Sequence, residues 1–163
     1  MLKTNHIYIL FFVIGSLLFF SCKKEPQPEP PAEDLSVSML QKVNQLRKTG
    51  CMCGSTFMPP VAQLQWNKPL ELAAQTHATD MYSKNYFDHI SPTGSIPSQR
   101  AAAAGYTGTY VTENIGKNYT SVDDVMKGWQ NSESHCKGMM DPMHTIMGAA
   151  VSHKYWVQEF GKE

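Results

Sequence analysis

The chain has 163 residues and carries 14 lysines and arginines against 14 aspartates and glutamates. This length suggests one domain. The balanced charge gives no electrostatic reason to bind nucleic acid or an anionic membrane surface, so we expect no nucleic acid among the partners.

The first 21 residues have the pattern of a secretory signal peptide. Lys3 precedes the apolar run IYILFFVIGSLLFF at 7–20, which has the length of a signal h-region and is short for a membrane span of about 20 residues. Ser21 and Cys22 follow, which resembles a bacterial lipobox, although Phe19 and Phe20 stand where leucine and a small residue are usual. We predict export to the bacterial cell envelope and attachment to the membrane through a lipid on Cys22. A plain signal anchor with an incidental cysteine is the alternative.

A short tether and one folded domain are expected after the signal peptide. Residues 22–34 hold the predicted lipidated cysteine and the stretch KKEPQPEPPAED, whose four prolines and alternating charges favour an extended segment. Residues 35–163 are enough for a hydrophobic core. They contain Cys51, Cys53 and Cys136, and in an oxidising compartment this odd number suggests one disulfide and one spare thiol.

Two helices are predicted in the first half of the domain. Apolar residues recur at helical spacing over 36–48, and Gly50 ends that pattern. Residues 51–65 contain two prolines and are interpreted as a loop. Asn67 is a good N-cap for a second helix to about residue 85, with Pro69 in its first turn. His77 falls on the apolar face of this helix, which favours a structural histidine.

Two more helices and a hairpin complete the predicted elements. A short helix opens at Ser95 and ends at Gly105, and Ser121 with Asp124 forms a capping box for the next helix. Residues 146–152 and 155–160 are apolar and β-prone, with SHK between them, which predicts a terminal hairpin. Helices followed by strands indicate an α+β layered domain.

A methionine-rich run precedes this hairpin. Its members are Met139, Met140, Met143, His144 and Met147. Soft thioethers favour Cu(I) as one interpretation, but methionine also fills gaps in apolar cores. We favour the core interpretation.

Six strings occur in a fixed order along the domain: LQWNKPLELAAQTHATDM at 64–81, YFDHISPTG at 86–94, TENIG at 112–116, WQNSESHC at 129–136, MG at 147–148 and YWVQEFG at 155–161. Their order and spacing resemble the CAP superfamily (cysteine-rich secretory proteins, antigen 5 and pathogenesis-related proteins; the SCP domain), in its bacterial branch. The resemblance covers residues 39–161.

The resemblance implies a fold and a site. The fold is a three-layer α-β-α sandwich with a central antiparallel sheet. The site is a cleft lined by two histidines, which fall on His89 and His135, and by two acids, of which the first falls on Glu113. The second acid is expected where this chain has Ser132, and the neighbouring Glu133 would point about 100° away on a helix.

The resemblance also implies a Cys53–Cys136 disulfide, because bacterial relatives commonly show one cysteine in a C-G string and one in an H-C string. Cys51 is then the extra thiol.

Two functions follow from this cleft. The favoured one is a non-enzymatic module that binds a peptide, a lipid or a cell-wall fragment and requires no cofactor. No G-x-S-x-G or H-E-x-x-H motif is present in the sequence. The alternative is a metal-assisted hydrolase that holds Zn²⁺ or another divalent ion on His89, His135 and Glu113, with Glu113 or Glu133 as general base.

Overall fold

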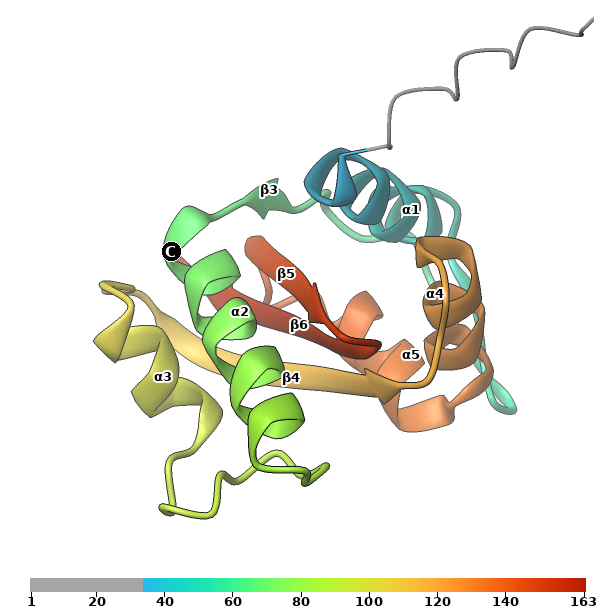
Figure 1. Cartoon of the computed structure of the whole chain (residues 1–163). Helices are drawn as coiled ribbons and strands as arrows, with labels where there is room; N and C mark the ends of the chain where they lie inside the picture. Colours follow the sequence, from blue (N-terminus) through green and yellow to red (C-terminus); the bar gives the residue numbers. More distant parts are fainter. Residues whose placement is uncertain (1–33) are drawn as a thin grey trace, which may run out of the picture. The chain divides into compact units, whose positions relative to one another are not determined.

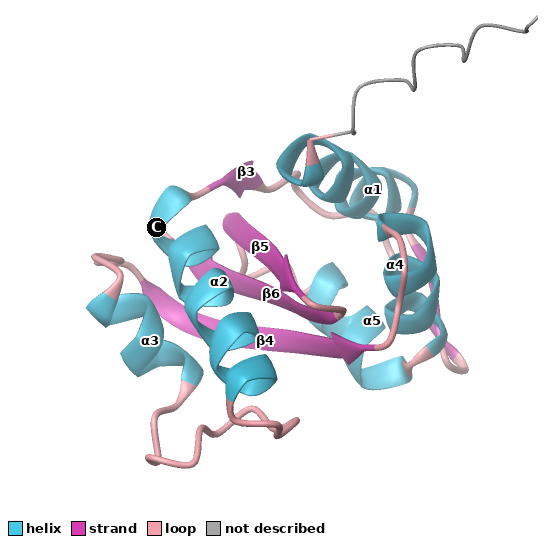
Figure 2. Cartoon of the chain, in the orientation of Figure 1, coloured by secondary structure: helices cyan, strands magenta, loops and turns pink. Residues whose placement is uncertain are grey.

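The computed structural model describes residues 34–163, so the predicted signal peptide, Cys22 and most of the tether lie outside the described residues. Figure 1 labels most of the elements along the chain, and Figure 2 separates helices from strands. In order they are α1 (Leu35–Thr49), β1 (Cys51–Cys53), β2 (Thr56–Met58), β3 (Gln65–Trp66), α2 (Lys68–Ser83), α3 (Pro97–Ala103), β4 (Thr109–Lys117), α4 (Val122–Asn131), α5 (Glu133–Met140), β5 (Ile146–Ser152) and β6 (Tyr155–Lys162).

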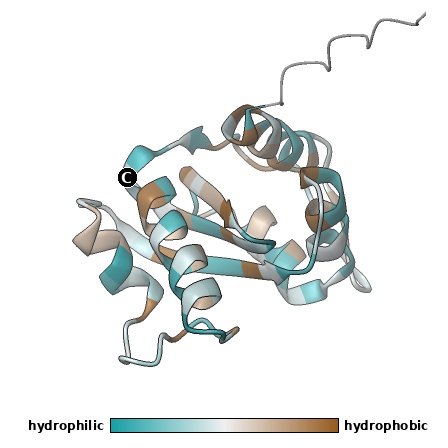
Figure 3. Cartoon of the chain, in the orientation of Figure 1, coloured by the Kyte–Doolittle hydropathy of each residue, from teal (hydrophilic) through white to brown (hydrophobic). Residues whose placement is uncertain are grey.

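Local sequence signals explain where the predicted helices begin. Asp34, expected in the tether, instead caps α1 by accepting a 2.9 Å hydrogen bond from the amide of Ser36. Asn67 caps α2 and Ser121 caps α4 in the same way, through the amides of residues three positions later. Figure 3 shows that the helices carry both hydrophilic and hydrophobic residues, as elements that cover one face of a sheet should.

The central sheet has the strand order β3-β5-β6-β4. β5 and β6 form the predicted terminal hairpin, and β4 pairs with β6, both antiparallel. His153 and Lys154 make the tight connection with φ of 48° and 68°, which matches the two-residue turns that join twisted strands. The sheet is not wholly antiparallel, since β3 pairs with β5 in parallel over two residues.

The two faces of the sheet are covered by different helices, as Figure 1 shows. Along β5, Met147 and Ala149 pack with residues of α1, α4 and α5, whereas Ile146 and Ala150 pack with residues of α2 and α3. This is the period of two expected for a strand buried on both faces. A Cβ at Gly148 would collide with the backbone of α2 at Leu70 and Glu71, so α2 lies directly on β5. The α+β, three-layer prediction is therefore confirmed.

Three regions differ from the sequence prediction. The expected loop at 51–65 contains the β1–β2 hairpin, with Cys51 paired to Met58. β4 was not predicted from its own pattern, because polar residues interrupt it. α5 is a separate helix after a break at Ser132, whose φ and ψ of −95° and 118° are extended rather than helical.

The methionine-rich run belongs mostly to the core. Met139, Met140 and Met147 are fully buried, and Met143 is 44% exposed. His144 is buried and donates from Nδ1 to the carbonyl of Gly138 at 3.1 Å, while its Nε2 accepts from Thr112 at 3.0 Å. Both imidazole nitrogens therefore have partners within the fold.

Arg47 is a fully buried charge that sequence periodicity did not reveal. Its guanidinium donates hydrogen bonds of 2.7–3.1 Å to the carbonyls of Ala62, Met139, Asp141 and His144. Burial lowers the pKa of Arg47 to about 10, and the charge of Asp141 opposes that change. The group thus stays charged at neutral pH and ties α1 to the segments before β3 and β5.

Candidate functional site

Glu113 lies at the centre of the candidate site, on the face of β4 toward α2 and α3. Its side chain is 1% exposed, and both carboxylate oxygens are engaged. Oε1 accepts a 2.7 Å hydrogen bond from His89 Nδ1, and Oε2 accepts one of 2.7 Å from Arg100 Nη2. A buried carboxylate needs such partners to stay ionised, so Glu113 holds these two side chains in place.

Arg100 also fixes the loop that carries His89. From α3 it donates to the carbonyl of His89 at 3.1 Å and to the carbonyl of Ser95 at 2.8 Å. Asp88 orders the same loop by accepting a 2.8 Å hydrogen bond from the amide of Ile90. The His89 side chain is therefore fixed at Nδ1 yet remains 47% exposed, which leaves its Nε2 edge for a ligand.

His77 is a structural histidine, in agreement with the interpretation of its apolar helix face. It is fully buried on α2, and its Nε2 donates to the carbonyl of Asp88 at 2.9 Å. The same nitrogen lies 3.8 Å from Glu113 Oε1. Burial lowers the pKa of His77, against the smaller opposite effect of Glu113, so the ring is neutral and supports the loop before His89.

Glu159 is a second, fully buried carboxyl beside Glu113. The two residues are direct partners in the β4–β6 register, and neither oxygen of Glu159 has a hydrogen-bond partner. Burial raises the pKa of Glu159 strongly, and the adjacent Glu113 charge raises it further. These effects favour the protonated form of Glu159, whose hydroxyl can donate toward Glu113.

His135 approaches from the other side of β4, which is an edge strand of the sheet. It lies on α5, and its carbonyl accepts a 3.1 Å hydrogen bond from the Asn114 side chain. It lines a cavity of about 280 Å³, whose walls include Phe87, Ile115, Tyr119 and Trp129 with the polar residues Lys117 and Ser132. The cavity thus combines an apolar wall with a few polar groups, which is the usual make-up of a ligand pocket.

The two residues considered for the missing acid have different positions. Ser132 lines the His135 cavity, and its hydroxyl lies 3.3 Å from that of Ser134. Glu133 is not among the residues that line this cavity. Its carboxylate pairs with Lys137 at 2.6 Å, is 51% exposed and lies against Gly54 of the β1–β2 turn.

The two histidines differ in their protonation. The hydrogen bond to Glu113 raises the pKa of His89, with burial opposing it. Burial lowers the pKa of His135, and the positive charge of His89 lowers it further. As the pH rises, His89 therefore keeps its proton to a higher pH than His135 does.

The residues predicted to hold a zinc ion do not fit one in this arrangement. Among residues 34–163, the one group whose three ligand atoms lie within 4.8 Å of one another is Cys51, Cys53 and Cys136. His89, Glu113 and His135 do not meet that distance, and both Glu113 oxygens are already used by Arg100 and His89. A zinc centre needs ligand atoms that converge on one point at about 2.0–2.2 Å.

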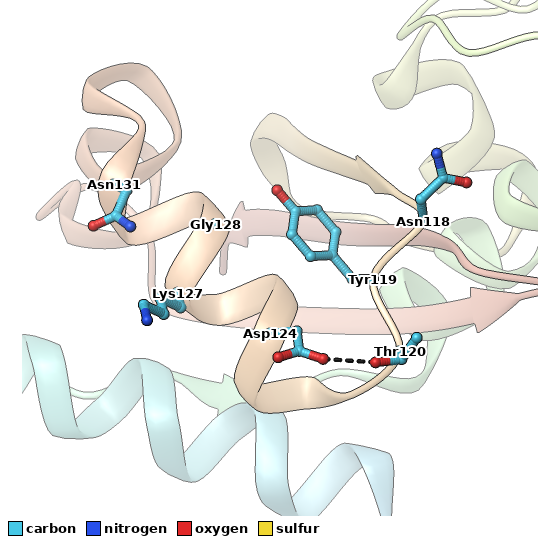
Figure 4. Close-up of a pocket in the computed structure, with 7 residues that line it drawn as sticks. All are labelled: Asn118, Tyr119, Thr120, Asp124, Lys127, Gly128 and Asn131. Atoms are coloured by element: carbon cyan, nitrogen blue, oxygen red, sulfur yellow. Dashed lines mark hydrogen bonds between the residues drawn. The ribbon is translucent and has the colours of Figure 1, made fainter.

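A second cavity of about 360 Å³ adjoins the first and is shown in Figure 4. The loop after β4 and one side of α4 form it, and Thr120 donates a 2.7 Å hydrogen bond to Asp124 there. Tyr119 and Gly128 border both cavities. A Cβ at Gly128 would collide with the Tyr119 ring, so a glycine is needed for the ring to pack against α4.

Cys53 and Cys136 form a disulfide with Cα atoms 5.4 Å apart, which is the pairing that the resemblance implies. The bond joins the β1–β2 hairpin to α5 next to His135. Cys51 is the free cysteine of the described residues.

Arg100 and Glu159 are the site residues that sequence reasoning missed. The sequence held a weak indication for Glu159. This residue stands two positions after Val157 in an apolar strand, so its side chain must face the same layer as that of Val157. Arg100 had none, because one arginine in a short alanine-rich helix is ordinarily exposed.

Residues 40–160 match the profile of the CAP family, described as the cysteine-rich secretory protein family. Among curated proteins, YkwD of Bacillus subtilis is 36% identical over 99 residues, and the membrane protein YlbC of the same organism is 33% identical over 102 residues. These matches take up 60% and 63% of this chain but 38% and 30% of the relatives.

Solved structures share the fold at low sequence identity. An extracellular SCP-domain protein of Bacillus anthracis superposes with a TM-score of 0.65 at 23% identity, covering 85% of this chain and 45% of that one. An outer surface protein of Borrelia burgdorferi gives 0.66 at 20% identity, covering 80% and 96%. Within residues 34–163, no helix has the length and apolar character needed to cross a membrane.

Proposed function

Because the chain belongs to the cysteine-rich secretory protein (CAP) family, we propose that its domain is a non-enzymatic binding module outside the bacterial cytoplasm. The site at His89 and His135 would hold a ligand that carries a hydrogen-bond acceptor beside an apolar group. A peptide, a lipid or a cell-wall fragment has this chemistry.

This proposal rests on the hydrogen bonds that already occupy both carboxylate oxygens of Glu113. A general base must reach the proton that it removes, but Glu113 is 1% exposed and its two oxygens accept hydrogen bonds from His89 and Arg100 at 2.7 Å each. Ser132 Oγ contacts Ser134 rather than His135, so this cleft serine lacks the adjacent base that activates a nucleophile. The arrangement instead presents histidine edges to a bound group.

The chemistry of the ligand follows from what lines the cleft. His135 and Lys117 of the cavity lining, together with the exposed His89 ring, favour carbonyl, carboxylate or phosphate oxygens. Phe87, 44% exposed, and the wall at Ile115 favour an apolar part of the ligand.

Nuclear magnetic resonance of the full chain tests binding with three probes: oleate, a muropeptide and a tripeptide with a free carboxylate. We expect one probe to shift the resonances of Phe87, Ile115 and His135, and His135→Gln to weaken its binding about tenfold, the loss of one hydrogen bond. His153→Gln is the matched control, because His153 is exposed and lies outside the cavity lining. If all three probes at millimolar concentration leave these resonances unchanged, the proposal fails.

Calorimetric titration with zinc tests the alternative function, a metal-assisted hydrolase. We expect weak binding or none, since the three ligands do not converge. Submicromolar binding that is lost in both His89→Ala and His135→Ala would instead favour the metal-assisted hydrolase.

The location outside the cytoplasm rests on the N-terminal sequence and on relatives described as extracellular, outer-surface or membrane proteins. We propose that Cys22 carries the lipid anchor. Metabolic labelling with a clickable fatty acid should mark the chain and lose the mark in Cys22→Ala. An unlabelled wild-type chain would end the anchor proposal without affecting the binding proposal.

A further inference from the structure

Three sulfur atoms meet where the β1–β2 hairpin contacts α5. Cys51 and Cys53 are two residues apart on β1, so their side chains leave the strand on the same face. Cys51 Sγ lies 3.7 Å from Cys136 Sγ and 3.9 Å from Cys53 Sγ. A free thiol therefore stands next to a formed disulfide, and the CAP resemblance accounts only for the two bonded cysteines.

The three cysteines differ in burial. Cys53 and Cys136 are fully buried and pack with Met140, whereas Cys51 is only partly buried. A small thiol in solution cannot reach the bonded sulfurs directly. Of these three cysteines, Cys51 is the one that can contact both the solvent and the disulfide.

We propose that Cys51 is an exchange nucleophile that links the buried Cys53–Cys136 bond to thiols in solution. The Cys51 thiolate attacks Sγ of Cys136, a Cys51–Cys136 bond forms, and Cys53 leaves as a thiolate that takes up the proton Cys51 released. This step has no net oxidation. A dithiol in solution can then reduce the new, more accessible bond and is itself oxidised to a cyclic disulfide.

Geometry selects Cys136 as the sulfur that is attacked. Attack at Cys53 would create a Cys51–Cys53 bond between positions i and i+2 of an extended strand, whose Cα atoms are about 6.6 Å apart, near the limit for a disulfide. Cys136 belongs to a different element and is the nearer sulfur.

A small movement of β1 is needed before exchange. Cys51 is almost equidistant from the two bonded sulfurs, so it lies beside the bond rather than on its axis, from which a thiolate attacks. The hairpin has room to move, because its strands are three residues long and its outer pair, Met52 and Phe57, is 53% and 59% exposed. We therefore expect exchange over minutes to hours, as for uncatalysed disulfide rearrangement.

The test uses the full chain with Cys22→Ser, so that only the three domain cysteines remain. After oxidation with oxidised glutathione, acid quenching and alkylation, peptide mapping of Cys53→Ser should find a Cys51–Cys136 disulfide. A folded Cys53→Ser chain in which Cys51 and Cys136 are both alkylated would overturn the proposal.

A kinetic measurement keeps the test decisive even if Cys53→Ser does not fold. Dithiothreitol at about pH 8.5, near the ordinary thiol pKa, should reduce the disulfide of the folded three-cysteine chain about tenfold faster than that of Cys51→Ser, since an intramolecular thiol has a high effective concentration. Met52→Ser is the control for disturbance of the hairpin and should keep the fast rate. Equal rates in the three-cysteine chain and Cys51→Ser would refute the proposal.

Discussion

Replacing Glu159 by glutamine would test the protonation state of the carboxyl pair beneath the candidate site. Glu159 is fully buried and faces Glu113 across the β4–β6 register. Glutamine keeps the size of the side chain and supplies an N–H donor in place of the carboxyl hydroxyl. The substitution therefore removes the titration of Glu159 while keeping a hydrogen-bond donor toward Glu113.

The sign of the pH effect follows from the raised pKa of Glu159. Above the ordinary glutamate pKa of 4.5 the unfolded chain releases this proton, while the folded chain retains it because of burial and the Glu113 charge. The unfolded state then binds fewer protons, so the free energy of unfolding of the wild type falls as pH rises. The fall is about 1.4 kcal/mol per pH unit until the folded state also releases the proton.

Urea unfolding from about pH 4.5 to pH 7.5 measures this effect for the wild type and Glu159→Gln. The two chains should have similar stability at the acid end, and the variant should become the more stable one as pH rises. Glu133→Gln is the control, because this glutamate is half exposed and paired with Lys137. Parallel stability profiles for wild type and Glu159→Gln would refute the assignment of a protonated, buried Glu159.

Three further predictions concern the histidines, the buried arginine and the disulfide. In an imidazole resonance titration, His89 should show a pKa above 6.5 and His135 one below it, and Glu113→Gln should lower the His89 value; the reverse order would contradict the geometry. Arg47→Met should lower the free energy of unfolding by about 3 kcal/mol or more, because four carbonyls lose a charged donor. A loss below about 1 kcal/mol in urea unfolding would show that water replaces the guanidinium as the donor to these carbonyls. Cys136→Ser should cost about 4 kcal/mol, given a sequence separation of 83 between the bonded cysteines, whereas Cys53→Ser should cost less if Cys51 takes its place.

The sequence by itself determined the elements whose signals are local. The helical spacing over 36–48, the Asn67 and Ser121 caps, and the two apolar runs around His153 all depend on residues a few positions apart, and the structure has α1, α2, α4 and the β5–β6 hairpin there. The ordered strings also indicated the family and the Cys53–Cys136 pairing, because both are read from the sequence pattern.

Only the tertiary structure decided how the site is built. β4 has a mixed polar pattern, and its place became clear from its pairing with β6, which sets Glu113 against Glu159. Whether a carboxylate is free or engaged depends on partners distant in sequence, here His89 and Arg100. The position of Cys51 beside the disulfide likewise depends on how the hairpin meets α5. Register and packing between layers bring these groups together, and no local sequence pattern encodes that contact.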